Sequence, residues 1–281
     1  MEYFVSAADD SVAAEYERLL DDGGYAVRDE YAADCVVLSV GGDGSILYNA
    51  RRYDEPTILP VAGAGSEANT VDVDEDRVSE RLATLEDGDE GTDYRLEPHR
   101  KLRASSDGAP IREGFPAIND VHVHHASPVR AAKFAVRVLD RANANDGGTG
   151  HDDGRTDDNG GHDEERAVYE AEKVIGDGVL VATPFGASGY YRSITNGVFD
   201  AGLGVAFDNV HKPADAPRSI SLSPAGRVET ELLTTTRSAS AVLARDDDTA
   251  VYELTPGERV SISLSDRVVR IVRFDAPSGR S

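Results

Sequence analysis

Near the N-terminus, segments with the apolar pattern of a β-strand alternate with segments that have the apolar spacing of an α-helix. Short apolar runs predict strands, and apolar positions at helical spacing between them predict helices. The predicted order is strand, helix, strand, helix, strand, at residues 3–6, 11–20, 36–40, 46–53 and 56–61. The run at 36–40 is almost wholly apolar, which is typical of a strand buried on both faces. This alternation predicts a parallel α/β sheet.

The pattern changes beyond about residue 95, where helical periodicity becomes scarce. Short β-like runs occur at residues 117–124, 133–139, 179–182, 202–207, 220–222, 240–243, 260–264 and 268–274. We therefore expect an α/β domain over residues 1–97 and a β-rich domain over residues 98–281, with the boundary near Glu97-Pro98. The last strands are expected to return to the first domain.

One segment, residues 142–166, differs from the rest of the chain in composition. It consists almost wholly of Gly, Asp, Asn, His and Glu and offers no large apolar side chain to bury. Such a composition predicts a disordered, acidic surface insertion. His151 and His162 lie within it beside aspartates. A flexible acidic tract rarely holds metal ligands in fixed geometry, so we predict no metal site there.

The charge of the chain is strongly negative. There are 52 acidic residues against 29 basic ones, a formal net charge of −23, and only four of the basic residues are lysines. A surface this acidic repels itself at low ionic strength, and salt near 1 M, where the Debye length is about 3 Å, screens that repulsion. The charge therefore favours salt adaptation over the alternative, a surface for basic partners. It also disfavours nucleic acid as a ligand.

The cysteine content and the apolar runs indicate a cytoplasmic protein. Cys35 is the only cysteine, so no intrachain disulfide can form, and we interpret it as a small core residue. No apolar run reaches the roughly 18 residues of a membrane span. The N-terminus lacks the basic and then apolar pattern of a signal peptide. A membrane is therefore not expected as a partner.

The first candidate for chemistry is the segment Gly41-Gly42-Asp43-Gly44-Ser45, which lies between the predicted buried strand and the following helix. The glycines let the backbone approach an anion closely. The start of the helix presents unpaired N–H groups and the positive end of its dipole, which suits a phosphate. Asp43 has no packing role at such a turn. A plain glycine turn with an exposed aspartate is the alternative.

Two further segments carry polar residues at strand ends. Asp177-Gly178 precedes a predicted strand that leads into Thr183-Pro184-Phe185-Gly186-Ala187-Ser188-Gly189-Tyr190, whose small residues can surround a flat polar ligand. Asn119-Asp120 lies near the start of another predicted strand, where the two side chains can hydrogen-bond ribose hydroxyls or a base edge. Each segment alone also fits an ordinary turn or cap.

In this order, the three segments resemble the NAD kinase family. Residues 41–45 resemble its GGDGT loop, and Asn119-Asp120 resembles its Asn-Glu/Asp pair. Asp177-Gly178 with residues 183–190 resembles its DG…TPTGSTAY segment, and the spacing Leu254-x-x-Gly257-x-x-Val260 also fits. The GGDG loop alone is shared with diacylglycerol and sphingosine kinases. The resemblance covers most of the chain from residue 35 onward.

The resemblance implies a fold and a reaction. The expected fold is an N-terminal α/β, Rossmann-like domain and a C-terminal β-sandwich, with the active site in the cleft between them. Asp43 would orient and deprotonate the 2′-hydroxyl of the adenosine ribose of NAD, and ATP or another donor would supply the phosphoryl group. Mg²⁺ would be carried mainly by the triphosphate, with no protein cage of its own. A homodimer or homotetramer is expected.

The resemblance also assigns binding residues. The loop glycines would hold phosphates, the dinucleotide pocket would be lined by polar side chains, and Arg130 is the first choice among nearby arginines and lysines to offset the acidic surface. The expected binding residues are Gly41, Gly42, Gly44, Asn119, Asp120, Arg130, Asp177, Thr183, Ser188 and Tyr190. His122 and His124 share a strand face, and lacking a third metal ligand they are interpreted as half-buried.

Three departures from the family pattern leave alternatives open. The expected Gly-x-Asn-x-Gly-x-Leu-Gly-Phe loop is replaced at residues 62–70, Phe185 and its neighbours replace family residues, and the usual Asp-Gly-Gln appears only as Asp247-Asp248-Thr249. The phosphate loop is intact and the dinucleotide pocket is altered. The sequence therefore leaves open a lipid-type kinase, a non-catalytic NAD(P)-binding paralogue, the NAD versus NADH preference, the donor and the oligomer size.

Overall fold

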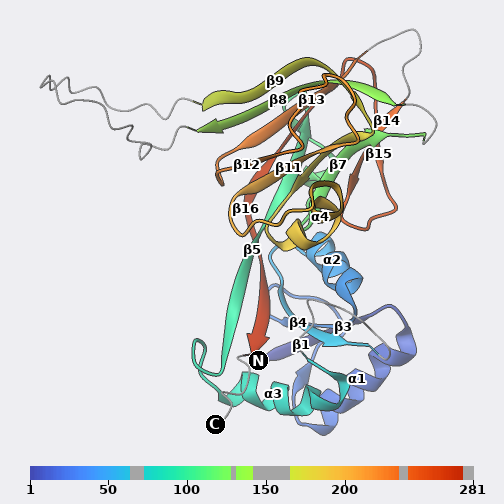
Figure 1. The fold of residues 1–281 in the computed structure, drawn as a ribbon. Helices are drawn as coiled ribbons and strands as arrows, with labels where there is room; N and C mark the ends of the chain where they lie inside the picture. Colours follow the sequence, from blue (N-terminus) through green and yellow to red (C-terminus); the bar gives the residue numbers. More distant parts are fainter. Residues whose placement is uncertain (64–72, 128–130, 142–164, 234–239, 275–281) are drawn as a thin grey trace, which may run out of the picture.

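The computed structural model describes residues 1–63, 73–127, 131–141, 165–233 and 240–274. These residues form a mixed α/β structure with two sheets. The first is a ten-stranded sheet with the order β2-β1-β3-β4-β16-β13-β8-β9, in which β5 also pairs with β16 and β6 pairs with β5. The second is a six-stranded sheet with the order β12-β11-β10-β7-β14-β15. Figure 1 shows that the N-terminal strands and helices lie at one end of the molecule and the second sheet at the other.

The N-terminal part contains the alternating elements expected from its apolar pattern. Its elements are β1 (Glu2–Ala7), α1 (Asp10–Asp22), β2 (Ala26–Val27), β3 (Val36–Gly41), α2 (Asp43–Arg52), β4 (Thr57–Ala62) and α3 (Val78–Asp87). β2, β1, β3 and β4 pair in parallel, which confirms the predicted parallel sheet. Apolar side chains of these strands, α1 and α3 form one core cluster. Helix α3 was not predicted.

Strand β16 (Arg259–Phe274) connects the two ends of the molecule. Its first half pairs with β13, and its second half pairs in parallel with β4, where Ile271 lies opposite Ile58. The last strand of the described chain therefore lies beside a strand of the N-terminal part. The runs at 260–264 and 268–274, predicted as two strands, are one strand with an irregularity between Leu264 and Val268.

Strand β5 (Tyr94–Ser106) pairs antiparallel with β16 along its length. It was not predicted, and the expected domain boundary near Glu97-Pro98 lies inside it. Figure 1 shows β5 and β16 running side by side from the N-terminal elements toward the end of the molecule that contains the second sheet. The chain therefore passes from one part of the molecule to the other within a regular strand.

The remaining elements are mostly short strands. They are β6 (Ala109–Pro110), β7 (Asp120–His125), β8 (Ala132–Arg141), β9 (Glu165–Gly176), β10 (Gly178–Ala182), α4 (Tyr190–Thr195), β11 (Leu203–Asp208), β12 (Ser219–Leu222), β13 (Arg227–Leu232), β14 (Ala241–Arg245) and β15 (Tyr252–Leu254). Strands β9, β13 and β15 were not predicted. Glu165 and Arg166, expected in the disordered insertion, belong to β9. The rest of that insertion, with His151 and His162, lies outside the described residues.

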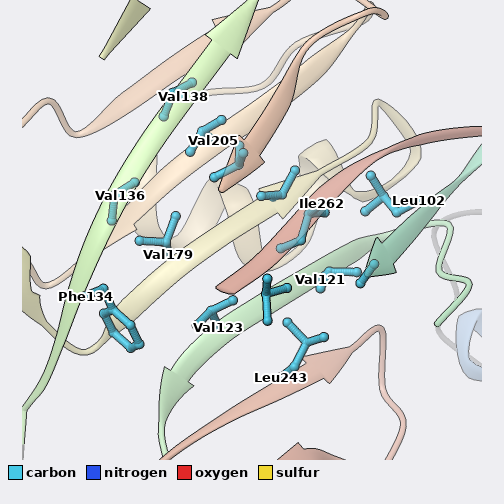
Figure 2. Packing of buried hydrophobic residues seen from close by; sticks show 14 of the residues in the cluster. Leu102, Val121, Val123, Phe134, Val136, Val138, Val179, Val205, Leu243 and Ile262 are labelled. Atoms are coloured by element: carbon cyan, nitrogen blue, oxygen red, sulfur yellow. The ribbon is translucent and has the colours of Figure 1, made fainter. Parts of the chain in front are cut away.

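An apolar cluster fills the space between the two sheets. Val121 and Val123 of β7 belong to one sheet, and Val136 and Val138 of β8 belong to the other, and all four are at most 1% exposed. Figure 2 shows these side chains pointing toward one another between the strands. Alternate residues of each strand face this layer, as in sheets packed face to face. The residues between them, such as Asp120 and His122, therefore face the other side of the second sheet.

A smaller cluster joins helix α2 to the second sheet. Ile46 and Leu47 of α2 pack with Ile118, which precedes β7, and with Ile271 of β16. This contact places the start of β7 beside the helix that follows the glycine loop. Within the part of the chain that the structure describes, no helix has the length and apolar character needed to cross a membrane.

Candidate active site

The glycine loop lies at the carboxyl end of β3, where helix α2 begins. Gly41 has a φ of +148°, a conformation that favours glycine. The N–H of Gly63 donates to the carbonyl of Gly41 at 3.0 Å, so the ends of β3 and β4 lie together. Asp43 is the first residue of α2, a position where the helix dipole stabilises negative charge. The open N–H groups of this helix start are suited to an anion.

A network of hydrogen-bonded polar side chains connects the glycine loop to the strands and helix behind it. The hydroxyl of Ser45 donates to the carbonyl of Gly42 at 2.7 Å and lies 3.1 Å from the hydroxyl of Ser39. The amide of Asn49 donates to Ser39 at 2.9 Å, and its carbonyl accepts from Ser6 at 2.8 Å. Ser39 and Asn49 are fully buried. Sequence reasoning missed both, although a serine inside an apolar strand was the available signal.

The segments containing Asn119 and Thr183 are in direct contact. The N–H of Thr183 donates to the carbonyl of Asn119 at 2.9 Å, and its hydroxyl donates to the carbonyl of Ile118. Gly186 packs on the backbone of Asn119, and a Cβ at this glycine would lie 2.6 Å from the carbonyl carbon. The structure therefore brings together two of the three predicted segments, next to α2.

Asp120 and Asp246 form a buried acidic pair at the same place. The carboxylate of Asp246 accepts from the N–H of Asn119 at 2.8 Å and from the N–H of Asp120 at 3.3 Å. Burial and then the charge of Asp246 raise the pKa of Asp120 to about 7. Asp246 was not predicted as a site residue, because only Asp247-Asp248-Thr249 in this turn corresponds to the Asp-Gly-Gln of the family pattern.

Asp177 lies at the opposite end of β10 from Thr183. In the pairing of β10 with β7, Ala182 is opposite Asp120 and Gly178 is opposite His124. Asp177 accepts from the side-chain amide of Asn209 at 2.9 Å. The structure thus places the five-residue strand β10 between the two ends of the predicted Asp-Gly…Thr-Pro segment, which separates them by roughly 20 Å.

Gly178 is required by close packing against β7. A Cβ at this position would lie 2.6 Å from Nε2 of His122. His122 is buried rather than half-buried as expected, and burial, followed by the charges of His124 and His125, lowers its pKa to about 3. Among the described residues, no three His, Cys, Asp or Glu side chains form a group that could hold a metal ion.

The remaining predicted residues lie on or near α4. Ser188 is exposed just before this helix, and Tyr190 is 57% exposed at its start, with its ring 5.9 Å from that of His122. A cavity of about 490 Å³ beside them is lined in part by Tyr190, Asp208 and Asn209. Arg130 and residues 64–70 of the altered loop lie outside the described residues.

The buried carboxyl of Asp120 leads to a prediction on stability. Its pKa is 3.8 in the unfolded chain and about 7 in the folded protein, so the folded state binds the proton more tightly. The resulting stabilisation is complete below about pH 4 and is lost as the pH rises through 7. We expect Asp120→Asn to be more stable than the wild type at pH 8, by about 4 kcal/mol, and the difference to shrink toward pH 4.

Chemical unfolding of both proteins in concentrated KCl, from pH 4 to pH 8, measures this difference. The variant Asp266→Asn, which changes an exposed carboxylate, is the control and should follow the wild type at every pH. A constant difference between Asp120→Asn and the wild type across this range would show that Asp120 does not titrate as described.

Comparison with known proteins gives two curated relatives, one of which covers nearly the whole chain. No protein-family model matches it. The NAD kinase of Methanopyrus kandleri is 28% identical over 278 residues, which are 97% of this chain and 83% of that protein. The NAD kinase of Methanocorpusculum labreanum is 27% identical over 196 residues, which are 68% of this chain and 55% of that protein.

The chain is similar to NAD kinases over nearly its whole length. Solved structures of this family have the same fold. The Archaeoglobus fulgidus NAD kinase in complex with ATP has a TM-score of 0.65 and 18% identity, covering 99% of this chain and 94% of that one. The yeast NADH kinase complexed with NADH has a TM-score of 0.72 and 12% identity, covering 99% and 84%. The NAD kinase resemblance drawn from three short segments is therefore confirmed.

Proposed function

We propose that this protein is an ATP-dependent NAD kinase, which transfers the γ-phosphoryl group of ATP to the 2′-hydroxyl of the adenosine ribose of NAD and gives NADP. The observation that carries the proposal is the position of Asp43. It is the first residue of α2, at a glycine loop that adjoins the Asn119-Asp120 segment, in a chain that aligns with NAD kinases over nearly its whole length. The lipid-kinase alternative is not favoured by these relatives.

The proposed chemistry needs few protein groups. The 2′-oxygen attacks the γ-phosphorus, the bond from that phosphorus to the β,γ-bridging oxygen breaks, and the hydroxyl proton passes to the Asp43 carboxylate. ADP leaves with the electron pair of the broken bond. Because such transition states are loose, catalysis consists mainly of positioning and charge neutralisation. Mg²⁺ would come with ATP and would neutralise charge on the triphosphate, in keeping with its preference for phosphate and water ligands.

The proposed binding residues follow the geometry of the two segments in contact. Gly41, Gly42 and Gly44 leave backbone N–H groups open to phosphates at the start of α2. The pocket for the dinucleotide is assigned to polar residues on both sides of the β7–β10 pair, namely Asn119, Asp120, Thr183, Ser188, Tyr190 and Asp177. Arg130 is assigned to the pocket from the sequence resemblance alone. The strand-length separation of Asp177 from Thr183 suits an extended ligand rather than a compact one.

The proposed organisation is an α/β domain over residues 1–97 and a β-sandwich domain over residues 98–281, with the active site in the cleft between them. The packing of Ile118 against Ile46 and Leu47 supports a site where the two parts meet. Long-strand pairing of β5 with β16 ties the two parts together. The net charge of −23 supports a salt-adapted protein. We also propose a cytoplasmic homodimer or homotetramer.

The experiment that tests the function is NADP formation from NAD and Mg-ATP by the folded protein in multimolar KCl. Product formed in proportion to enzyme is the expected result. NADH as acceptor and polyphosphate as donor, assayed in parallel, establish the preferred substrates. Tight NAD(P) binding without turnover would contradict the proposal and indicate a binding paralogue. Phosphorylation of diacylglycerol instead of NAD would indicate a lipid-type kinase.

A further inference from the structure

The turn between β14 and β15 contains three consecutive aspartates that contact the site from the side opposite to Thr183. The side chain of Asp246 is fully buried, whereas that of Asp247 is half exposed. Asp246 has a φ of +44°, in the left-handed region that aspartate tolerates. Its N–H donates to the carbonyl of Asp120 at 2.9 Å. This turn is therefore fixed to the beginning of β7 through its backbone.

The carboxylate of Asp246 binds the same segment through its side chain. One oxygen accepts from the N–H groups of Asn119 and Asp120, and the other lies 3.4 Å from the N–H of Ile118. Three consecutive backbone donors thus converge on one carboxylate. Charge-assisted bonds of this kind are roughly twice as strong as neutral ones. Asp246 therefore determines the path of the backbone that carries the Asn119 and Asp120 side chains.

Arg51 connects this carboxylate to helix α2. It lies in the last turn of the helix that begins at Asp43, and its side chain is 11% exposed. Its Nη1 lies 3.6 Å from Asp246 and 2.6 Å from Asp247, and its Nε lies 3.9 Å from Asp248. One arginine therefore holds all three aspartates of the turn.

Asp247 contacts the start of the same helix. A Cβ at Gly44 would lie 2.9 Å from its Oδ2. Gly44 and Arg51 are seven residues apart, which places them on one face of α2. The turn thus lies along this face from the glycine loop to the last helical turn, and the absence of a side chain at Gly44 permits the approach.

We propose that Asp246 and Arg51 are positioning residues, which together fix the Asn119-Asp120 segment relative to Asp43 and the glycine loop. The proposal rests on the proposed function for its effect on catalysis. Arg51 belongs to the element that carries Asp43, and Asp246 is bonded to the element that carries the proposed dinucleotide pocket. The ion pair between Arg51 and Asp246 therefore joins the helix that carries Asp43 to the segment that carries Asn119 and Asp120. Neither residue is expected to touch a substrate.

Loss of Arg51 would leave the Asp246 carboxylate buried without its positive partner. A carboxylate in that situation takes up a proton or moves toward water. Either change weakens the three backbone bonds and lets the Asn119-Asp120 segment shift. A shift of about 1 Å in a reacting group is enough to lower turnover about 100-fold. The cost should appear in kcat and in the KM for NAD more than in the KM for ATP.

The kinetic test compares Arg51→Met with Arg259→Met. Arg259 pairs with Glu231 at 3.0 Å on the first sheet, away from this turn, and its loss controls for breaking an ion pair. We expect Arg51→Met to lower kcat/KM for NAD about 100-fold, with the KM for ATP changed less than about threefold, and Arg259→Met to match the wild type. Arg51→Lys, which keeps a positive charge, should recover part of the loss.

A double-mutant cycle with Asp246→Asn separates a shared role from two independent ones. If Arg51 acts through Asp246, the double variant should lose no more kcat/KM than the more severe single variant. Losses that multiply would overturn the proposal, as would a reduced melting temperature with unchanged turnover per folded molecule.

Amide hydrogen exchange of the unliganded protein tests the positioning without any assumption about the reaction. In Arg51→Met, the N–H groups of Asn119 and Asp120 should exchange at least about tenfold faster than in the wild type, and those in the core strand β10 should not. Unchanged protection at residues 118–120 would refute the structural part of the proposal. Faster exchange in a protein without NAD kinase activity would retain the positioning role and refute only the proposed function.

Discussion

Asp43→Asn should lower kcat for NADP formation by about a thousandfold and leave the protein folded. Asparagine has the shape of aspartate but cannot accept the 2′-hydroxyl proton at neutral pH. Proton acceptance by a positioned side chain contributes typically about 10²–10⁴ to a rate. The substitution also removes a negative charge from the first turn of α2, which costs about 0.3–1 kcal/mol through the helix dipole. The large effect should therefore be on turnover and the small one on stability.

Steady-state kinetics with NAD and Mg-ATP in multimolar KCl measures this effect. Asp10→Asn is a matched control, because Asp10 is likewise the first residue of a helix, α1, and is not among the proposed site residues. It should show the same small loss of stability and the turnover of the wild type. If Asp43→Asn retains wild-type turnover, another group accepts the proton and the assigned mechanism is wrong. If both variants lose turnover equally, the loss comes from helix stability and not from chemistry.

The elements that could be predicted well from the sequence are those whose own residues show a clear apolar pattern. Strand β3 is buried on both faces, so its apolar run was visible without any knowledge of its neighbours. Strand β5 has a proline, a histidine and four arginine or lysine residues, and its place in the sheet comes from pairing with β16, more than 150 residues away. Strand β9 is mostly exposed, so its residues carry no apolar period. Such strands form because a partner supplies their backbone hydrogen bonds.

The same distinction applies to the candidate site. The glycine loop was predictable because its chemistry, three glycines and an aspartate between a strand and a helix, is contained in five consecutive residues. Asp246 was not, because three aspartates in a turn look like a solvated loop in a chain with 52 acidic residues. Only the tertiary structure shows that one of them is buried and accepts backbone N–H groups from residues 118–120. Long-range polar contacts of this kind leave no spacing pattern in the sequence.

Gly186→Ala should damage both stability and activity, because this glycine packs directly on the backbone of Asn119. A Cβ at Gly186 would lie 2.6 Å from the carbonyl carbon of Asn119 and 2.7 Å from its Cα. A flexible side chain could move aside, but backbone atoms cannot move alone. Asn119 is held on one side by Asp246 and on the other by Thr183. Overpacking at such a place costs about 3 kcal/mol.

The activity should fall further than the stability alone explains. To accommodate the methyl group, Asn119 must move away from residues 183–186, which opens the proposed dinucleotide pocket. We expect kcat/KM for NAD to fall at least about 100-fold in the fraction that remains folded. Thermal unfolding and kinetics on the same preparations measure the two losses separately. Gly197→Ala is the control, since the nearest atom to a Cβ there is 3.7 Å away, and it should change neither quantity.

Comparison of the loss of stability with the loss of kcat/KM shows what the contact between Gly186 and Asn119 contributes. A fall in melting temperature with normal kcat/KM would mean that Asn119 can shift without affecting NAD, and it would remove Asn119 from the proposed pocket. A fall in kcat/KM for NAD with an unchanged KM for ATP would place the defect on the dinucleotide side. Because the glycine loop makes no contact with Gly186 through the described hydrogen bonds, ATP binding should survive the substitution. Separate losses for the two substrates would thus support a site whose phosphate and dinucleotide parts come from different elements of the fold.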